Sequence, residues 1–243
     1  MKTSDGAYQQ CYNGQALVDS RAQVIVACEL SAEAPDARQL APALEQLARN
    51  LDTIGAELPE DATLTADAGY FSADNVRITA RHGLDAHIAT GRFKHSEPPP
   101  PAPRGPLPRT ATAKQQMARK LRTKRGRAVY SRRKTIVEPV FGQMHTVQSA
   151  RQLLLRGTQA ARGQWRFHCA VHNLLKLHRA GGLDLIREHD AASARPVADK
   201  RSHLPSLTTA AHALAAGFRR TLAAISLDRS VRIASIALTD PGS

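Results

Sequence analysis

Ala62-Thr-Leu-Thr-Ala-Asp67-Ala-Gly-Tyr70-Phe-Ser72 combines the signals of a strand, a turn and a helix start within one short part of this 243-residue chain. Residues 62–66 form a short run of apolar and β-branched side chains, which predicts a buried strand. The Asp67–Tyr70 segment predicts a sharp exit from that strand, because Asp and Gly favour turns. Ser72 fits the N-cap of a helix that extends to about Arg81. A strand, a turn and a helix in this order are typical of an α/β sheet.

The flanking sequence adds three strands and one long helix. Two apolar runs, residues 16–18 and 24–28, predict a β-hairpin, and residues 85–90 predict another strand. A helix with Asp36 as its N-cap is expected to end near Gly55. Its apolar positions recur three and four residues apart: Leu40, Ala43, Leu44, Leu47 and Leu51. The resulting order, β-β-α-β-α-β, predicts an α/β sheet with helices on its faces.

The hairpin raises a question about what lies beside it. Its second run is apolar throughout, as is typical of a strand covered on both faces. A hairpin alone makes a marginal sheet. We therefore expect that a preceding strand is missing or that the hairpin forms an edge.

A long basic segment follows these elements. No acidic residue occurs between Glu97 and Glu138. Residues 96–108 are rich in proline, which excludes helix and interior strand, and residues 114–127 resume a helical pattern. The whole chain has a formal net charge of +13, which predicts a polyanionic partner. Only 4% of its residues are aromatic, so phosphate contacts are favoured over base stacking.

Glu138 ends the basic segment and lies on a predicted helix. The apolar positions of this helix recur at helical spacing, and they are Val137, Phe141 and Met144. Lys134, Glu138 and His145 are expected to share the neighbouring face. Pro139 fits only near a helix start or a kink, so Glu138 is expected in or near the first helical turn.

Asp67 and Glu138 are candidate ligands of a metal ion. Asp67 directly follows a buried strand, where α/β sites commonly form. Carboxylates suit Mg²⁺, and two such ions could activate the attacking oxygen and stabilise the leaving oxygen of a phosphodiester. From spacing alone, however, a simpler interpretation is favoured, in which Asp67 forms a turn and Glu138 pairs with Lys134 on the helix surface.

Other motifs exclude several classes of protein. Cys11, Cys28 and Cys169 are too few and too widely spaced for a disulfide framework or a structural zinc site. His168 and His172 share a helical face but lack the Glu of a metalloprotease, so core or DNA-facing positions are favoured. The glycines form no phosphate-binding loop. No signal peptide or membrane-length apolar run is evident, which predicts a cytoplasmic protein without a membrane partner.

Several motifs, taken in order, resemble the catalytic domain of bacterial insertion-sequence DDE transposases. They are Cys11-Tyr-Asn-Gly-Gln-Ala-Leu-Val-Asp19, Gln23-Val-Ile-Val-Ala27, Thr65-Ala-Asp67-Ala-Gly-Tyr70-Phe-Ser72, Tyr130-Ser-Arg-Arg133-Lys-Thr-Ile-Val-Glu138-Pro-Val-Phe-Gly142-Gln143, Leu155-Arg-Gly157 and Trp165-Arg-Phe-His-Cys-Ala-Val-His-Asn173-Leu-Leu-Lys-Leu177. The resemblance extends from the N-terminus to about Leu177. The joint order of the motifs is much more specific than any one of them.

The resemblance implies a ribonuclease H-like mixed sheet flanked by helices. It also implies DNA strand cleavage and transfer at insertion-sequence ends, with two Mg²⁺ ions, or Mn²⁺ as a substitute, held by Asp, Asp and Glu. Asp67 matches the second Asp and Glu138 matches the Glu, so both are expected to be catalytic residues and metal ligands.

The resemblance also implies which residues contact DNA. Tyr130 and Arg133 match a Tyr and an Arg that contact DNA phosphate near the cut end. His145 stands where the family has a Lys, and a mostly neutral His would hold phosphate less firmly. Three more basic residues are expected to bind DNA, and they are Lys134, Arg125 and Arg127.

The family's first Asp has no match in this chain. It lies on a strand upstream of the Tyr-Asn-x-Gln strand, and neither Asp5 nor Asp19 corresponds to it. We therefore expect an N-terminally truncated transposase that lacks its first strand, retains two of three metal ligands and is inactive as this fragment. The full-length form is expected to be a homodimer.

The domain organisation follows from these assignments. Residues 1–95 are expected to form the first part of the catalytic domain, and residues 96–127 a proline-rich and then basic insertion. Residues 128–182 are expected to carry the Glu, and residues 183–243 to form a helical C-terminal appendage.

Two other functions remain open on the sequence alone. A non-catalytic basic DNA-binding protein could use residues 104–134 for phosphate contacts. A ribonuclease H-like nuclease, the weaker alternative, would hydrolyse DNA strands without joining them.

Overall fold

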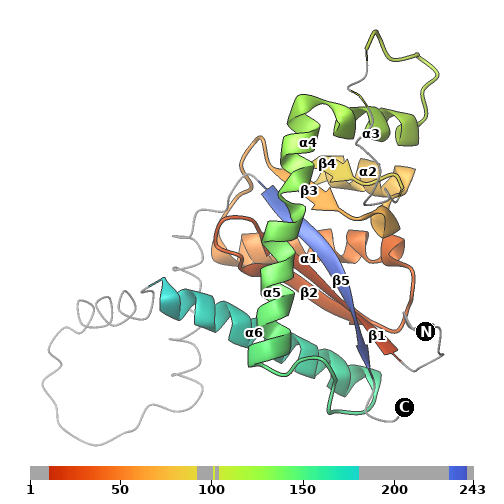
Figure 1. The fold of residues 1–243 in the computed structure, drawn as a ribbon. Coiled ribbons are helices and arrows are strands. Elements are labelled where there is room, and N and C mark those ends of the chain that lie inside the picture. The colour runs from red at the N-terminus through yellow and green to blue at the C-terminus, as the bar shows by residue number, and fades with distance from the viewer. Residues whose placement is uncertain (1–10, 92–100, 102–103, 181–229, 240–243) are drawn as a thin grey trace, which may run out of the picture.

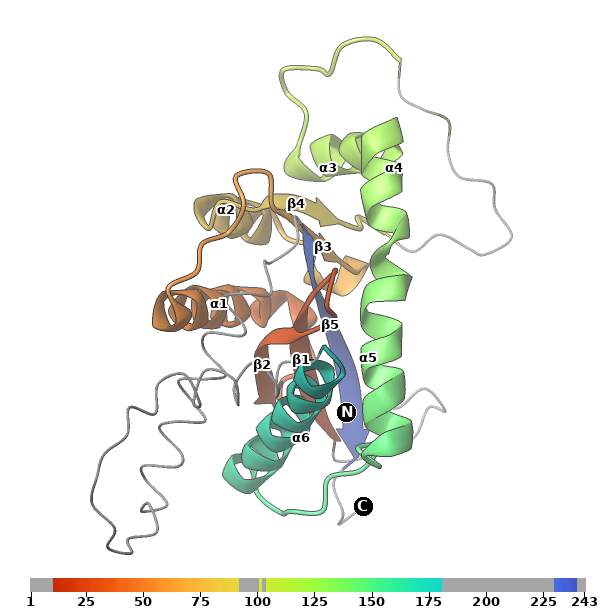
Figure 2. The ribbon, with the colours of Figure 1, turned by 90° about the vertical axis from the view of Figure 1, so that its left-hand side faces the viewer.

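The computed structural model describes residues 11–91, 101 and 104–180, and the backbone of residues 230–239. This part of the chain forms a mixed sheet between two groups of helices (Figures 1 and 2). The strands are β1 (Cys11–Asp19), β2 (Ile25–Ser31), β3 (Thr63–Ala66), β4 (Asp85–Ile88) and β5 (Ser230–Thr239), in the spatial order β2-β1-β5-β3-β4. The predicted α/β class is confirmed.

The sheet combines antiparallel and parallel pairs. β1 is antiparallel to both β2 and β5, whereas β3 is parallel to both β5 and β4. The predicted hairpin is therefore confirmed, and β2 is an edge strand.

The C-terminal strand differs from the sequence prediction. We expected the tail to be helical, but Ser230–Thr239 is a central strand of the sheet. Its β-branched residues, Val231, Ile233 and Ile236, suit a strand. Its backbone hydrogen-bond partners, however, come from β1 and β3, which are far away in the sequence, so the local pattern did not reveal the strand. The helical pattern around Leu207 to Leu222 lies outside the described residues.

One face of the sheet is covered by α1 (Leu40–Ile54) and α2 (Ala73–Arg81) (Figure 2). The core on this side combines helix and strand residues, including Leu17, Leu40, Leu44, Leu47, Leu64, Tyr70 and Ile88. The predicted helix ends are confirmed: Gly55 ends α1 with φ of 66°, and the Ser72 hydroxyl accepts a hydrogen bond from the Asn75 N–H at 2.9 Å.

The other face is covered by α5 (Arg133–Val147) and α6 (Thr158–Arg179) (Figure 2). The core on this side includes Tyr12, Ala16, Val18, Ile136, Val140, Met144 and Trp165. The Trp165 indole N–H donates to the Gln15 carbonyl at 3.1 Å, so the largest buried side chain also has its polar atom satisfied.

The basic helices α3 (Ala113–Arg122) and α4 (Lys124–Ser131) lie at the β4 end of the sheet, and α4 leads almost directly into α5 (Figure 1). The two helices meet closely at Gly126. A Cβ atom at this position would lie 2.0 Å from the Lys120 carbonyl oxygen, so only glycine fits. None of the helices in the described part of the chain is long and apolar enough to cross a membrane.

Candidate nucleic-acid interface

Asp67 directly follows β3 and begins the short 3-10 helix η2 (Ala68–Tyr70). Its carbonyl oxygen accepts the Tyr70 N–H at 3.1 Å, which closes the predicted sharp turn. Gly69 lies against the Asp36 carboxylate, since a Cβ atom there would be 2.8 Å from Oδ2. The side chain of Asp67 is 51% exposed, and it stands at the carboxyl end of a buried strand.

A buried polar network supports this turn from the α1 side. The Asp36 carboxylate accepts hydrogen bonds from the side-chain amides of Asn13, at 2.8 Å, and Gln15, at 3.2 Å. The Tyr70 hydroxyl donates to Gln15 Oε1. The network therefore joins the Tyr-Asn-x-Gln motif of β1 to the Asp-Ala-Gly-Tyr motif that carries Asp67.

The role predicted for Asp36 is wrong. It lies in a separate 3-10 helix, η1 (Asp36–Arg38), and Gln39 occupies the N-cap of α1. The hydrogen bonds of Asn13 and Gln15 draw its carboxylate toward β1. The alternation of amide side chains along a buried strand was the available sequence signal, because buried amides require hydrogen-bond partners.

Arg133 connects the turn after β3 to the basic helices. Its Nε lies 3.3 Å from Asp67 Oδ1, and its guanidinium carbon lies 4.5 Å from the centre of the Tyr130 ring. Such stacking is favourable for arginine because its planar cation meets the negative face of the ring. The Arg133 side chain is only 28% exposed. Asp67, Arg133 and Tyr130 thus form one contiguous cluster drawn from the turn after β3, from α5 and from α4.

Glu138 lies near the start of α5, just beyond its first turn. It is the sixth residue of α5 and belongs to the second helical turn, and Pro139 lies inside the helix. The helix tolerates this proline because the carbonyl of Thr135, which an ordinary residue at position 139 would satisfy, accepts a hydrogen bond from Gln23 Nε2 at 2.9 Å. The position of Pro139 therefore did not mark the helix start.

The buried stripe of α5 decides which side chains face the sheet. It is formed by Ile136, Val137, Val140 and Met144. Each residue turns the helix by about 100°, so Arg133 lies on the same face of the helix as this buried stripe. Glu138 is two positions from both Ile136 and Val140, which places it on nearly the opposite side, where it is exposed. Arg133 therefore reaches Asp67, whereas Glu138 faces outward near Lys134.

Exposed basic side chains occur on α3, on α4 and at the start of α5, in the same segment of the chain as Tyr130 and Arg133. They are Lys114, Lys124, Arg125, Arg127, Arg132 and Lys134. We call these six residues the basic surface. Because residues 104–137 include no carboxylate, the charges of the basic surface are not neutralised from within their own segment.

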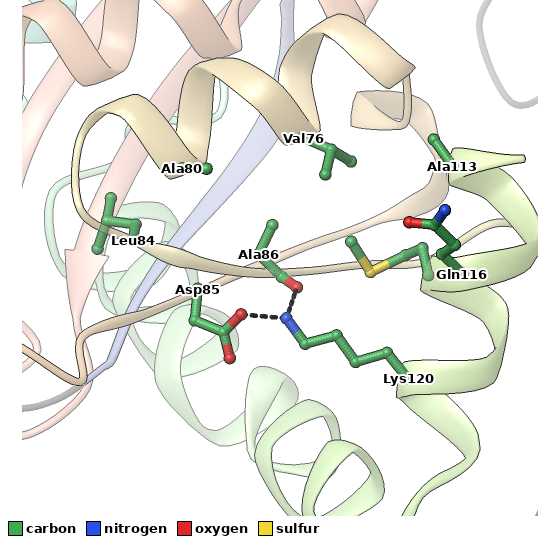
Figure 3. A pocket seen from close by; sticks show the side chains of 9 residues that line it. Val76, Ala80, Leu84, Asp85, Ala86, Ala113, Gln116 and Lys120 are labelled. Atoms are coloured by element: carbon green, nitrogen blue, oxygen red, sulfur yellow. Dashed lines mark hydrogen bonds and ion pairs between the residues drawn. The ribbon is translucent and has the colours of Figure 1, made fainter. Parts of the chain in front are cut away.

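Lys120 belongs to the same segment but has a structural task. Its ammonium group donates to the Asp85 carboxylate and, at 2.7 Å, to the Ala86 carbonyl at the outer edge of β4 (Figure 3). These contacts border a pocket of about 230 Å³ between α2, β4 and α3, with apolar walls that include Val76, Leu84 and Met117. The charge of Lys120 is therefore paired with a protein carboxylate.

The histidines resemble core residues more than metal ligands. His172 is buried, and its Nε2 lies 2.9 Å from the Gln23 carbonyl oxygen. Burial lowers the pKa of His172, and the cations of Lys176 and Arg179 lower it further. His145 is half-buried on α5, and burial together with Arg151 lowers its pKa. At neutral pH a lowered pKa keeps His145 uncharged, so it adds no cation to the basic surface.

The described carboxylates do not make up a metal centre. Among residues 11–91 and 104–180, no three His, Cys, Asp or Glu side chains come together in a group that could hold a metal ion. The Asp67 carboxylate instead faces the Arg133 guanidinium. An ion with ligands at Asp67 and Glu138 would need both side chains to rearrange, so we derive no reaction step through a metal.

Comparison with known proteins bears on this same segment. Residues 107–178 match the family model described as the transposase DDE domain. The resemblance to DDE transposases is thereby confirmed. The matched segment contains the basic surface, Tyr130, Arg133 and Glu138, and ends near the end of α6. Searches of the curated proteins and of the solved structures found no match.

Proposed function

We propose that this chain is a ribonuclease H-like domain of the DDE transposase type that binds DNA and is impaired in strand cleavage and transfer. The observation that carries the proposal is the contact between Arg133 and Asp67. It joins the carboxylate that follows β3, which lies outside the matched segment, to an arginine within that segment. Two motifs of the resemblance, separated by more than sixty residues, therefore meet at one place on the surface.

The sheet supports the ribonuclease H-like assignment. β5 lies between β1, which carries the Tyr-Asn-x-Gln motif, and β3, which leads to Asp67. The resemblance calls for a further strand that carries the first Asp, and β5 has a central place suited to that strand. Its sequence, Ser-Val-Arg-Ile-Ala-Ser-Ile-Ala-Leu-Thr, contains neither Asp nor Glu. We infer that β5 completes the sheet without supplying the first carboxylate.

Electrostatics supports DNA as the partner. Each Lys or Arg that neutralises a phosphate releases condensed counterions, and this release drives binding without base contacts. We propose phosphate contacts for Arg125, Arg127 and Lys134, which are exposed on α4 and the start of α5. Tyr130 and Arg133 would contact phosphate next to them, at the border with Asp67.

The carboxylates support impaired catalysis. Asp67 and Glu138 are the proposed catalytic residues and Mg²⁺ ligands, with Mn²⁺ as a substitute. They are one carboxylate short of the three that the resemblance requires, and Arg133 already neutralises one of them. A site with fewer anionic oxygens binds a hard cation more weakly. The ion pair also favours the second candidate function, a non-catalytic DNA-binding protein.

Binding of duplex DNA in EDTA tests the partner. We expect the affinity, measured by fluorescence anisotropy, to fall steeply with salt. The triple variant R125A/R127A/K134A should lower the slope of log K against log salt by about 2 to 3, because each lost phosphate contact removes about 0.9. The matched control R38A/R49A/R77A removes three exposed cations on the α1 side. Equal losses in both variants would refute the proposed interface.

Nicking of supercoiled plasmid tests catalysis separately. With Mg²⁺ or Mn²⁺, we expect the wild-type chain to nick no faster than the variant D67N/E138Q. Metal-dependent nicking by the wild-type chain that Asp67→Asn abolishes would overturn the impairment. DNA binding without such nicking would support either the impaired transposase domain or the non-catalytic alternative.

A further inference from the structure

β5 fills the centre of the sheet although it comes from the C-terminal end of the chain. Its backbone pairs with β1 along the whole strand, from Cys11 opposite Thr239 to Asp19 opposite Val231. On its other side it pairs with β3, from Thr63 opposite Ser230 to Thr65 opposite Arg232. Without β5, the sheet would separate into the β1–β2 hairpin and the β3–β4 pair, each with an open inner edge. We call the space between these two edges the strand slot.

The outer edges of the sheet are covered by side chains. At β2, the Asn173 side chain accepts from the Ile25 N–H and donates to the Ile25 carbonyl, both at 2.8 Å. Gln46 Oε1 accepts from the Cys28 N–H at 3.0 Å, and Asn50 Nδ2 donates to the Val26 carbonyl at 2.7 Å. At β4, Lys120 donates to the Ala86 carbonyl. Covered edges resist pairing with another chain.

The strand slot therefore differs from every other edge in the described sheet. An extended segment that enters it gains backbone hydrogen bonds on both sides, whereas a segment at an outer edge must first displace side chains. Extended segments that add to a sheet are held mainly by such backbone bonds. The segment that fits the slot is β5 itself, and a second copy of the chain carries the same segment.

The connection to β5 permits exchange between copies. Residues 181–229 separate the end of the α6 region from β5. A chain of roughly fifty residues can span at most roughly 165–180 Å, which is several times the width of a small domain. A connection of this length can therefore deliver β5 to its own slot or to the slot of an adjacent copy.

We propose that β5 is an exchangeable strand and that the strand slot is an interaction site for a second copy of this chain, which donates its own Ser230–Thr239 segment. The backbone pairs are the same in the closed monomer and in the exchanged dimer, so the equilibrium between these two states depends on the protein concentration. A tethered strand meets its own slot at an effective concentration that does not depend on the protein concentration, of the order of millimolar for a short linker and lower for a longer one. The closed monomer should dominate in dilute solution, and the exchanged dimer should grow as the protein approaches that concentration.

Because Cys11 pairs with Thr239, a disulfide between positions 11 and 239 can trap either the closed monomer or the exchanged dimer. The full-length variant Thr239→Cys places a cysteine at the strand position paired with Cys11, and paired positions generally have Cβ atoms about 4.5–5.5 Å apart. The protein is equilibrated at about 1 μM or about 1 mM and oxidised, and the products are separated on a non-reducing gel. Peptide mapping by mass spectrometry then locates the disulfide. The control carries Thr239→Cys together with Cys11→Ser.

We expect an internal disulfide in dilute samples and a dimer linked through Cys11 at high concentration, with neither product in the control. An internal disulfide alone at both concentrations would overturn the exchange, and failure to form any Cys11 disulfide would overturn it as well. A second measurement uses the unaltered chain, so it does not depend on the folding of the variant. Copies with two different affinity tags, mixed and captured at about 1 mM, should be recovered together, and their separate recovery at that concentration would contradict the proposal.

Discussion

Arg133 Nε lies 3.3 Å from Asp67 Oδ1, so the arginine that stacks on Tyr130 is shared between a carboxylate and the basic surface. A guanidinium that pairs with a carboxylate is less available to a phosphate. Both Asp67 and Arg133 are partly exposed, and exposed ion pairs contribute about 0.2–1 kcal/mol. If the proposed interface binds DNA, its affinity should therefore depend on Asp67, a residue that carries no positive charge.

Replacement of Asp67 by Ala should strengthen DNA binding, because Arg133 becomes available to phosphate. An ion pair of that strength corresponds to a gain in affinity of up to about fivefold. The gain should disappear when Arg133→Ala is also present, as measured by anisotropy on the same duplex in EDTA. Asp74→Ala is the control, because it removes an equal charge from an exposed pair with Arg77 on α2. Equal effects of the two Asp substitutions would count against a specific role for Asp67.

The sequence was sufficient for the elements whose signals are local. The hairpin, the helix cap at Ser72 and the end of α1 at Gly55 all depend on neighbouring residues, and all three predictions are confirmed. The resemblance to DDE transposases depended on motifs in order and is also confirmed. Local patterns therefore identified the frame of the fold and the segment that carries the candidate site.

The wrong predictions concern features that distant residues determine. Asp36 does not cap α1, because its carboxylate accepts hydrogen bonds from Asn13 and Gln15 instead. Pro139 lies inside α5 because Gln23, far away in sequence, satisfies the Thr135 carbonyl. β5 forms because β1 and β3 supply its hydrogen-bond partners. The roles assigned to Asp67, Glu138 and the DNA-binding residues stay predictions.

Replacement of Gly126 by Ala should destabilise the junction of α3 and α4. The new Cβ would lie 2.0 Å from the Lys120 carbonyl oxygen, and because this neighbour is backbone, one helix must move. Overpacking of this kind costs about 1–3 kcal/mol, measurable as a lower free energy of unfolding in urea. Gly142→Ala in α5 is the control: a Cβ there meets nothing within 4 Å, and helix propensity predicts a gain of about 0.5–1 kcal/mol. A neutral Gly126→Ala would contradict the close contact of α3 and α4.

Replacement of Asn173 by Leu should weaken the contact between α6 and the outer edge of β2. The variant loses two hydrogen bonds to the Ile25 backbone, and each is worth about 0.5–1.5 kcal/mol. We expect the free energy of unfolding to fall by about 1–3 kcal/mol. Hydrogen exchange at the Ile25 amide should become faster, because its acceptor is lost. Leu174→Asn changes the next side chain, which is 51% exposed, and should leave that amide protected. Similar exchange rates in the two variants would refute the role of Asn173.

Acid should destabilise the protein through His172. Burial lowers the pKa of this histidine from its ordinary value of 6.5, and the nearby cations Lys176 and Arg179 lower it further. The unfolded chain therefore binds a proton at His172 more readily than the folded chain does. The stabilising contribution is complete above pH 6.5 and is lost progressively as the pH falls toward and through the lowered pKa.

This dependence can be measured by urea unfolding at pH 7.5 and pH 5.5. His172→Gln keeps a side-chain N–H that can reach the Gln23 carbonyl but removes the titrating group, so the loss of stability between the two pH values should become smaller. His178→Gln, at an exposed position on the same helix, should leave the loss unchanged. A loss of stability between pH 7.5 and pH 5.5 that is larger in His172→Gln than in the wild type would reverse the predicted sign, since it would mean that protonation of His172 favours the folded state.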